Sequence, residues 1–302
     1  MIFVVMFYAG NILIGKGMNE LPPFTIAFFR LLVAFILLLP IGLLAAWRDR
    51  KRFWIYKTPF LIMTLTGITF FNTFIYGALQ FTSASNVAVL ETAIPVMTVI
   101  LSALLLKEKL RSIQWFGISL SFLGALSVVL QGGIFELSAM NWNIGDAIMI
   151  GAIICWAFYS ILVKQYMNLF HPFGSLLVMT GISVLILFPF VIVEWSIIGI
   201  PSFELPSHLI GTLYLGIFPS FIALVFYNRA VDFLSASRAS VFLNFLPIFT
   251  MVGAYFWLNE TITLYQVFGS LIVIFGVTLT TYFSKSSEES KENIKEEKQI
   301  IE

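Results

Sequence analysis

Two stretches of the chain, FTSASNVAVLETAIP at residues 81–95 and FLSASRASVFLNFLP at residues 233–247, lie over each other without a gap. The phenylalanine, the Ser-Ala-Ser triplet and the final proline recur at an offset of 152 residues. The same offset pairs Glu108 with Glu260, Gln114 with Gln266, Gly117 with Gly269 and Gly124 with Gly276. Because chance matches would not keep one register over this length, the sequence predicts an internal repeat.

The repeat extends toward the N-terminus. NILIGKGMNELPPF at residues 11–24 matches SILVKQYMNLFHPF at residues 160–173 at an offset of 149, which also places Pro40 on Pro189. We therefore expect a first repeat over residues 1–131 and a second over 143–284, followed by a tail at 285–302.

Composition places the chain in a membrane. Of 302 residues, 59% are hydrophobic and only 11% are charged, whereas a soluble domain carries about 25% charged residues. An apolar stretch of about 20 residues is long enough to cross a hydrocarbon core of about 30 Å as a helix. The sequence predicts an all-α polytopic membrane protein with ten transmembrane helices, at 2–19, 24–46, 58–79, 84–106, 113–131, 143–165, 172–195, 207–231, 236–258 and 263–284.

Five helices per repeat is an odd number, so the second repeat is expected to enter the membrane inverted. With a cytoplasmic N-terminus, 15 of the 17 basic residues fall in cytoplasmic segments, as the preference of Lys and Arg for the cytoplasmic side requires. This predicts a multi-pass protein of the cell membrane with both termini in the cytoplasm. The tail at 285–302 is rich in Glu and Lys, and we expect it to be disordered.

Inverted repeats suit alternating access, because two similar halves can rock about a site between them. A net charge of +1 gives no reason to expect a nucleic-acid partner. The single cysteine, the absence of clustered metal-ligating residues and the lack of a phosphate-binding loop predict no metal, no cofactor and no direct use of ATP. Two other classes stay open: an intramembrane enzyme that modifies lipids or prenyl groups, and a non-transporting membrane receptor.

The chain resembles the EamA-type permeases of the drug/metabolite transporter superfamily. The resemblance rests on IGKGMNELPPFTIAFFRLL at residues 14–32, on the Ser-Ala-Ser, proline and Lys-Glu run that begins at Ser83, and on its echo from Ser235. It implies a permease that moves small metabolites such as amino acids or amphiphilic compounds, commonly outward. It also implies that Lys16 and Arg30 stand at positions typical of the family.

Proline breaks a helix because it lacks an N–H group and its ring crowds the carbonyl four residues earlier. Pro95 frees the carbonyl of Glu91, and Pro247 frees that of Leu243. We interpret both prolines as helix breaks beside a central path. A packing kink stabilised by neighbouring helices is the alternative.

An ionisable residue inside a membrane span is by default a functional candidate. Glu91, Arg30 and Lys16 are expected to share a layer near the outer side, with Glu91 about 10 Å below the outer end of its helix. Glu91 and Arg30 could form a structural ion pair. Alternatively, Glu91 could carry a proton, or Glu91 with Arg30 or Lys16 could bind the two charges of a zwitterion. The repeat places Met179 and Leu243 at the positions of Arg30 and Glu91, so these charges occur in one copy only.

Further candidates are weaker. Trp156 and Tyr159 lie three residues apart and could stack on an apolar substrate, although contacts with lipid or with other helices would explain them equally. Polar groups within the spans could face the substrate or bond neighbouring helices: Asn11, Asn72, Tyr76, Tyr227 and Asn244. Gly117, Ser121 and Gly124, with Gly269 and Gly276, predict close helix packing. Glu108 and Glu260 are expected to act as caps near the membrane interface.

Overall fold

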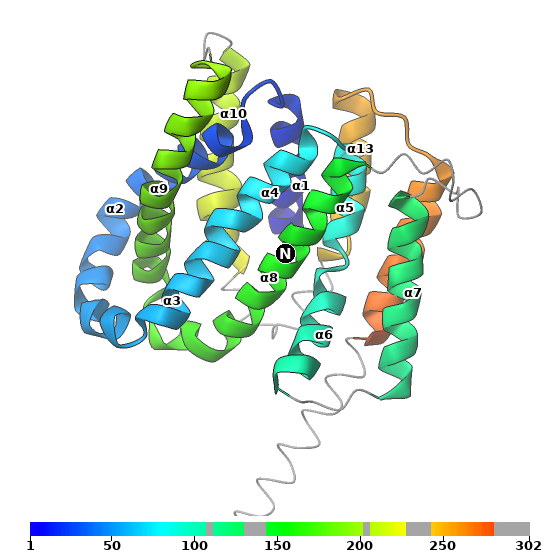
Figure 1. The fold of residues 1–302 in the computed structure, drawn as a ribbon, viewed down its shortest axis with the longest axis horizontal. Helices are drawn as coiled ribbons and strands as arrows, with labels where there is room; N and C mark the ends of the chain where they lie inside the picture. Colours follow the sequence, from blue (N-terminus) through cyan, green and yellow to red (C-terminus); the bar gives the residue numbers. More distant parts are fainter. Residues whose placement is uncertain (107–110, 130–142, 202–205, 228–242, 281–302) are drawn as a thin grey trace, which may run out of the picture.

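The computed structural model describes residues 1–106, 111–129, 143–201, 206–227 and 243–280, and the regular structure in these ranges is entirely helical. Figure 1 shows the helices in three groups, with α2, α9 and α10 at one side, α7 and α13 at the other, and α4, α5 and α8 between them. The labelled helices are α1 (Ile2–Gly17), α2 (Pro23–Ile55), α3 (Lys57–Met63), α4 (Phe71–Leu79), α5 (Ala84–Glu91), α6 (Ile94–Leu106), α7 (Ser112–Val129), α8 (Ile144–Tyr166), α9 (Pro172–Ile198), α10 (Pro206–Ile217) and α13 (Leu246–Trp257).

The predicted fold class is confirmed at the level of an all-helical, polytopic membrane protein. Within the described ranges, six helical segments are long and apolar enough to cross a membrane: Pro23–Ile55, Lys57–Leu79, Ala84–Leu105, Ile144–Leu169, Pro172–Ile198 and Pro206–Tyr227. Four apolar helices are shorter: Ile2–Gly17, Ser112–Val128, Leu246–Trp257 and Leu264–Thr280. The helix expected at 24–46 is longer than predicted, because it continues through the basic segment to Ile55. The predicted tail at 285–302 lies outside the described residues.

Helices α2 and α9 contact each other along their length, and each supplies a carboxylate to the N-terminus of the other. Glu194, near the end of α9, accepts hydrogen bonds from the backbone N–H groups of Phe24 and Thr25 at 3.1 and 2.9 Å and from the Thr25 hydroxyl at 2.7 Å. The first N–H groups of a helix have no partner within it and attract negative charge. The buried Glu194 side chain therefore caps α2.

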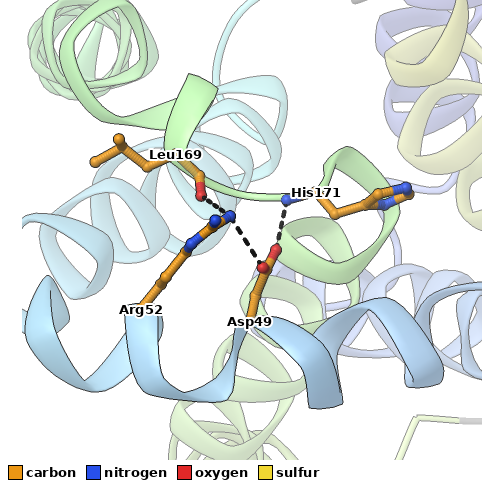
Figure 2. Close-up of polar contacts among 4 residues, drawn as sticks. All are labelled: Asp49, Arg52, Leu169 and His171. Atoms are coloured by element: carbon orange, nitrogen blue, oxygen red, sulfur yellow. Dashed lines mark hydrogen bonds and ion pairs between the residues drawn. The ribbon is translucent and has the colours of Figure 1, made fainter.

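The reverse cap lies at the opposite end of the pair. Asp49, near the end of α2, accepts a 2.7 Å hydrogen bond from the backbone N–H of His171, the residue before α9 (Figure 2). Arg52 bonds the other oxygen of Asp49 at 3.2 Å and the carbonyl of Leu169 at 3.0 Å. The two long helices thus run antiparallel and hold each other's starts.

Helix α7 meets the helix Leu264–Thr280 through glycines. A Cβ atom added to Gly276 would lie 2.6 Å from the carbonyl oxygen of Gly117, and one added to Gly124 would lie 2.9 Å from that of Gly269. Backbones can approach this closely only where no side chain intervenes. The close packing predicted for these glycines is confirmed.

The segments around the two expected break sites have the same local form. Helix α5 ends at Glu91, a turn follows at Thr92–Ala93, and α6 begins at Ile94 with Pro95 as its second residue. Before α13, a turn at Asn244–Phe245 follows Leu243, and Pro247 is the second residue of the new helix. Each proline therefore stands where its missing N–H costs no helical hydrogen bond.

Two π-helical turns interrupt the spans that precede these breaks. The first, η1 (Thr64–Phe70), joins α3 to α4, and the second, η4 (Phe218–Ile222), follows α10. At the offset of 152, η1 falls on residues 216–222 and overlaps η4. Such widened turns are uncommon and often mark functional positions.

Candidate functional site

Arg30 is the centre of a buried polar cluster. Its side chain is only 3% exposed, and the described residues around it supply neutral oxygen acceptors. Nη1 donates to Asn11 Oδ1 and to Asn72 Oδ1, each at 2.8 Å, and to the hydroxyl oxygen of Tyr76. Nε and Nη2 both donate to Ser220 Oγ, at 2.9 and 2.6 Å. A buried charge needs such partners because it has lost its water.

The acceptors around Arg30 are themselves held in place. The Tyr76 hydroxyl donates to Asn11 Oδ1 at 2.8 Å, and Asn72 Nδ2 donates to the carbonyl of Ile68 at 2.8 Å. Ser220 Oγ donates to the carbonyl of Leu215 at 2.7 Å, which leaves its lone pairs for the guanidinium. Through Ser220 in η4, the cluster connects α1, α2 and α4 with the second half of the chain.

The ion pair between Glu91 and Arg30, one of the interpretations that the sequence left open, is not formed. Both residues are described, and no ion pair or hydrogen bond joins their side chains. Depth in the membrane was the basis for pairing them, but a shared depth does not make two helices turn their side chains toward each other. The polar cluster around Arg30 provides the hydrogen bonds that the ion pair was expected to provide.

Within the described residues, the Glu91 carboxylate makes no hydrogen bond or ion pair. Its side chain is partly exposed, while Leu90 before it and Thr92 after it are buried.

Among the tyrosines within the spans, Tyr8 and Tyr227 are partly exposed, whereas Tyr76 and Tyr159 are buried. Sequence reasoning did not select Tyr8, because one tyrosine in an apolar helix carries no signal of the face it occupies.

Trp156 and Tyr159 contact each other and the first half of the chain. Their ring centroids are 5.0 Å apart, and Trp156 stands 4.3 Å from the ring of Phe71. The Tyr159 ring packs directly on Gly67 in η1, where a Cβ atom would collide with the ring. Tyr159 therefore fits against the widened turn. Asn244 lies in the turn before α13 and is buried.

Lys16 is bound to the turn between α4 and α5. Its Nζ donates to the carbonyls of Leu79 and Thr82 at 2.7 and 2.8 Å, and a cation at the C-terminal end of a helix is favourable. These bonds engage Lys16 at the end of α4.

Glu260 holds the other side of the same turn. It accepts hydrogen bonds from the backbone N–H groups of Ala84 and Ser85 at 2.8 and 3.3 Å and from the Ser85 hydroxyl at 2.9 Å. Its expected role as a cap is confirmed, since it satisfies the N-terminus of α5. Glu108 lies outside the described residues. We call Lys16, Glu260 and the turn 79–85 between them the end clamp.

No group of three or more His, Cys, Asp or Glu residues that could hold a metal ion occurs in the described ranges. The candidate site consists of the Arg30 guanidinium with its neutral acceptors, the Glu91 carboxylate, which has no hydrogen-bond partner among the described residues, and the rings of Trp156 and Tyr159.

Comparison with known proteins gives relatives over nearly the whole chain. "Uncharacterized transporter YyaM" of Bacillus subtilis is 28% identical over 222 residues, which cover 72% of this chain and 71% of the relative. An "Uncharacterized transporter" of Archaeoglobus fulgidus is 28% identical over 286 residues, 92% of this chain and 94% of its own length. One solved crystal structure shares the fold, with a TM-score of 0.58 at 14% identity over 95% of this chain and 98% of that one.

These relatives carry the name of transporters, which indicates a transporter rather than an enzyme. A family model described as the EamA-like transporter family matches residues 1–130 and 143–282. The chain therefore belongs to the EamA-like transporter family.

Proposed function

We propose that the protein is a secondary transporter that exports small metabolites, such as amino acids or amphiphilic compounds, from the cell by alternating access. Ten transmembrane helices form two inverted five-helix repeats, residues 1–131 and 143–284, in the cell membrane, with both termini and the tail 285–302 in the cytoplasm. The substrate enters between the repeats, and the energy comes from a gradient, with protons as the candidate coupling ion.

The glycine contacts are the observation that carries this proposal. At the offset of 152, Gly117 corresponds to Gly269 and Gly124 to Gly276. The contact of Gly117 with Gly276 thereby becomes the contact of Gly269 with Gly124, and both contacts exist. A two-fold axis between the repeats would interchange these two contacts, and it therefore requires both of them to exist.

The breaks support the same symmetry. Glu91 and Leu243 are 152 residues apart, and the same turn and the same proline spacing follow each of them. The mutual capping of α2 and α9 by Asp49 and Glu194 joins the corresponding long helices of the two repeats. Repeated interruptions near the centre of spans are typical of helices that line a transport path.

The side chains of the candidate site are suited to a transport path between the repeats. The buried cluster of Arg30, Asn11, Asn72 and Tyr76 holds the helices beside the path together, and Glu91 remains available for a proton or for a substrate charge. Trp156, Tyr159 and Tyr227 supply an aromatic wall, and the end clamp with Lys16 closes one end of the helix pair α4–α5.

A metabolite comparison tests transport. Cells that overproduce the wild-type protein, cells that overproduce Glu91→Gln and cells without the protein are grown in parallel, and mass spectrometry measures the small molecules in cells and medium. We expect at least one metabolite to accumulate in the medium only with the wild-type protein. Identical media from all three strains, with both proteins present in the membrane, would contradict export.

A further inference from the structure

Helix α2 is longer than a membrane crossing requires. Its 33 residues extend over about 50 Å at 1.5 Å per residue, whereas the hydrocarbon core of a bilayer is about 30 Å thick. The apolar stretch of the helix ends at Ala46, and residues 47–55, WRDRKRFWI, continue it with basic residues and tryptophans. This last part of α2 therefore lies where the hydrocarbon ends, at the level of the lipid head groups.

Contacts on one side fix the rotation of this segment. Asp49 is buried and accepts the hydrogen bond from the backbone N–H of His171 (Figure 2). Phe53, four residues later, stacks on Phe170 with ring centroids 4.9 Å apart. Since side chains advance by about 100° per residue around a helix, these contacts turn the opposite side of α2 away from the protein.

The side of the segment that is turned outward carries basic and aromatic side chains. We call it the basic face, and its members are Trp47, Arg48, Arg50, Lys51, Trp54 and Ile55, all of them exposed. The only acidic residue between positions 40 and 60 is Asp49, which is buried and bound by Arg52. The basic face therefore has no carboxylate of its own to balance its charge.

The tryptophans hold cations at the membrane interface. The guanidinium carbon of Arg50 lies 4.7 Å from the centroid of the Trp47 ring, and the Lys57 ammonium lies 5.0 Å from that of Trp54. Indole rings prefer the interface between hydrocarbon and water. Arg48 and Lys51, on the same face, form no hydrogen bond or ion pair with the residues that the structure describes. They are available to an anion from outside the protein.

The basic face continues the surface that α2 turns toward lipid. Leu44 is 72% exposed, and Arg48 and Lys51 follow it by four and seven residues, a spacing that places all three on one side of a helix. The rise along the helix separates them from Leu44 by about 6 and 10 Å. A molecule with an apolar tail and a phosphate head matches this order, because its tail would lie on Leu44 and its phosphate would meet the two cations. A soluble acidic protein offers the charge without the tail.

We infer that the basic face binds the phosphate of an anionic phospholipid. Arg48 and Lys51 supply the charge, the two tryptophans lie at the level of the glycerol, and the acyl chains follow the exposed leucines Leu43 and Leu44. This binding goes beyond the proposed transport and does not depend on it, since it requires only that α2 lies in a membrane.

Two lipids with the same acyl chains separate charge from the apolar contribution: phosphatidylglycerol, which is anionic, and phosphatidylcholine, which has no net charge. Native mass spectrometry of the purified full-length protein in detergent measures the affinity for each. We expect phosphatidylglycerol to bind at least about tenfold more tightly, because each basic residue near a membrane surface contributes about fivefold. Equal affinities would overturn the inference.

Single substitutions locate the lipid on the basic face. Arg48→Gln and Lys51→Gln should each lower the affinity for phosphatidylglycerol about fivefold and leave that for phosphatidylcholine unchanged. Arg111→Gln is the matched control, because it removes an exposed cation just before α7, and it should bind as the wild type does. Equal losses in all three variants, or no loss in any, would overturn the inference.

Two water-soluble anions test the other occupants of such a face. Inorganic phosphate represents the head group without its tails, and polyglutamate represents an acidic protein. Neither should displace phosphatidylglycerol when it is added at the same concentration as the lipid. Displacement by either would mean that the face binds charge alone, which would contradict a lipid site.

The wild-type protein allows a further measurement that does not depend on the folding of a variant. In nanodiscs, acetic anhydride acetylates exposed lysines, and peptide mass spectrometry follows each site. Nanodiscs that contain phosphatidylglycerol should slow the acetylation of Lys51 at least about threefold more than that of Lys164, an exposed lysine of α8 outside the basic face, relative to pure phosphatidylcholine. Equal slowing of both lysines would show a general effect of the charged membrane and would overturn the inference.

Discussion

The turn at Thr92–Ala93 and the turn at Asn244–Phe245 interrupt corresponding helices in the same manner, with a proline two residues into the helix that follows. They differ in the residue just before the turn, which is Glu91 in the first half and Leu243 in the second. The shared break is a requirement of the fold, because both halves have it. The carboxylate is not, and the fold accepts leucine at the same place. The comparison separates the architecture, which is repeated, from the chemistry, which is not.

The strongest test of this comparison places the same residue, leucine, at positions 91 and 243. Glu91→Leu copies the second half into the first and removes the free carboxylate. We expect transport of the metabolite identified in the screen to fall to the level of protein-free liposomes. The free energy of unfolding should stay within about 1 kcal/mol of the wild type or rise, because no hydrogen bond is lost.

The measurement combines uptake into proteoliposomes with thermal unfolding of the same preparation. Leu243→Met is the control in the second half, and it should leave both unchanged. Transport by Glu91→Leu at the wild-type rate would show that the charge is dispensable.

Arg30 and Met179 form a second pair of corresponding positions with different chemistry. Arg30→Met leaves Asn11, Asn72, Tyr76 and Ser220 without their donor, so we expect a loss of about 3 kcal/mol in unfolding free energy. Met179→Leu, a swap of similar volume at a fully buried site, should cost less than about 1.5 kcal/mol. Chemical denaturation in mixed detergent measures both. Equal losses would mean that the polar cluster contributes nothing beyond packing.

The two glycine contacts, Gly117 with Gly276 and Gly124 with Gly269, test whether the two halves are equivalent where they meet. Gly276→Ala and Gly124→Ala place a methyl group 2.6 and 2.9 Å from a carbonyl oxygen of the opposite helix. Each should cost about 2 kcal/mol by forcing the backbones apart. In Gly77→Ala the nearest atom, Ile148 Cγ2, is 3.8 Å away, so stability should be unchanged. Clearly unequal losses for Gly276 and Gly124 would argue against equivalent contacts.

Much of the architecture was predictable from the sequence. Apolar length gave the spans, and the repeat register located the glycine contacts and the positions of Pro95 and Pro247. Such features are visible because they depend on residue type and spacing along one chain. The capping role of Glu260 was expected for the same reason, since it lies at the end of a span.

The partners of the charged residues were not predictable. Ser220 lies 190 residues from Arg30, and Lys16 binds backbone carbonyls, which have no side-chain signature. Span prediction gives the depth of a residue but not the rotation of its helix. For this reason the sequence could place Glu91 and Arg30 in one layer but could not decide whether their side chains meet. The π-helical turns at Thr64–Phe70 and Phe218–Ile222 also lack a clear sequence signal.

The smallest expected effect concerns the prolines themselves. Pro95→Ala and Pro247→Ala restore one N–H group at the second position of a helix, where it has no carbonyl to bind. Stability should change by less than about 1 kcal/mol in both variants, as measured by thermal unfolding. A loss confined to Pro95→Ala would show that the two breaks are held differently, despite their common form.

The central claim is that the two halves move relative to each other so that the site opens alternately to each side. The end clamp allows a direct test, because Ser85 on α5 and Glu260 after α13 are in contact at 2.9 Å. In a Cys155→Ser background, Ser85→Cys and Glu260→Cys are joined by a short bifunctional thiol reagent, and transport is measured in proteoliposomes before and after reductive cleavage of the link. The account predicts that cross-linking stops transport and that cleavage restores it. Transport at an unchanged rate with the link fully formed would contradict the account.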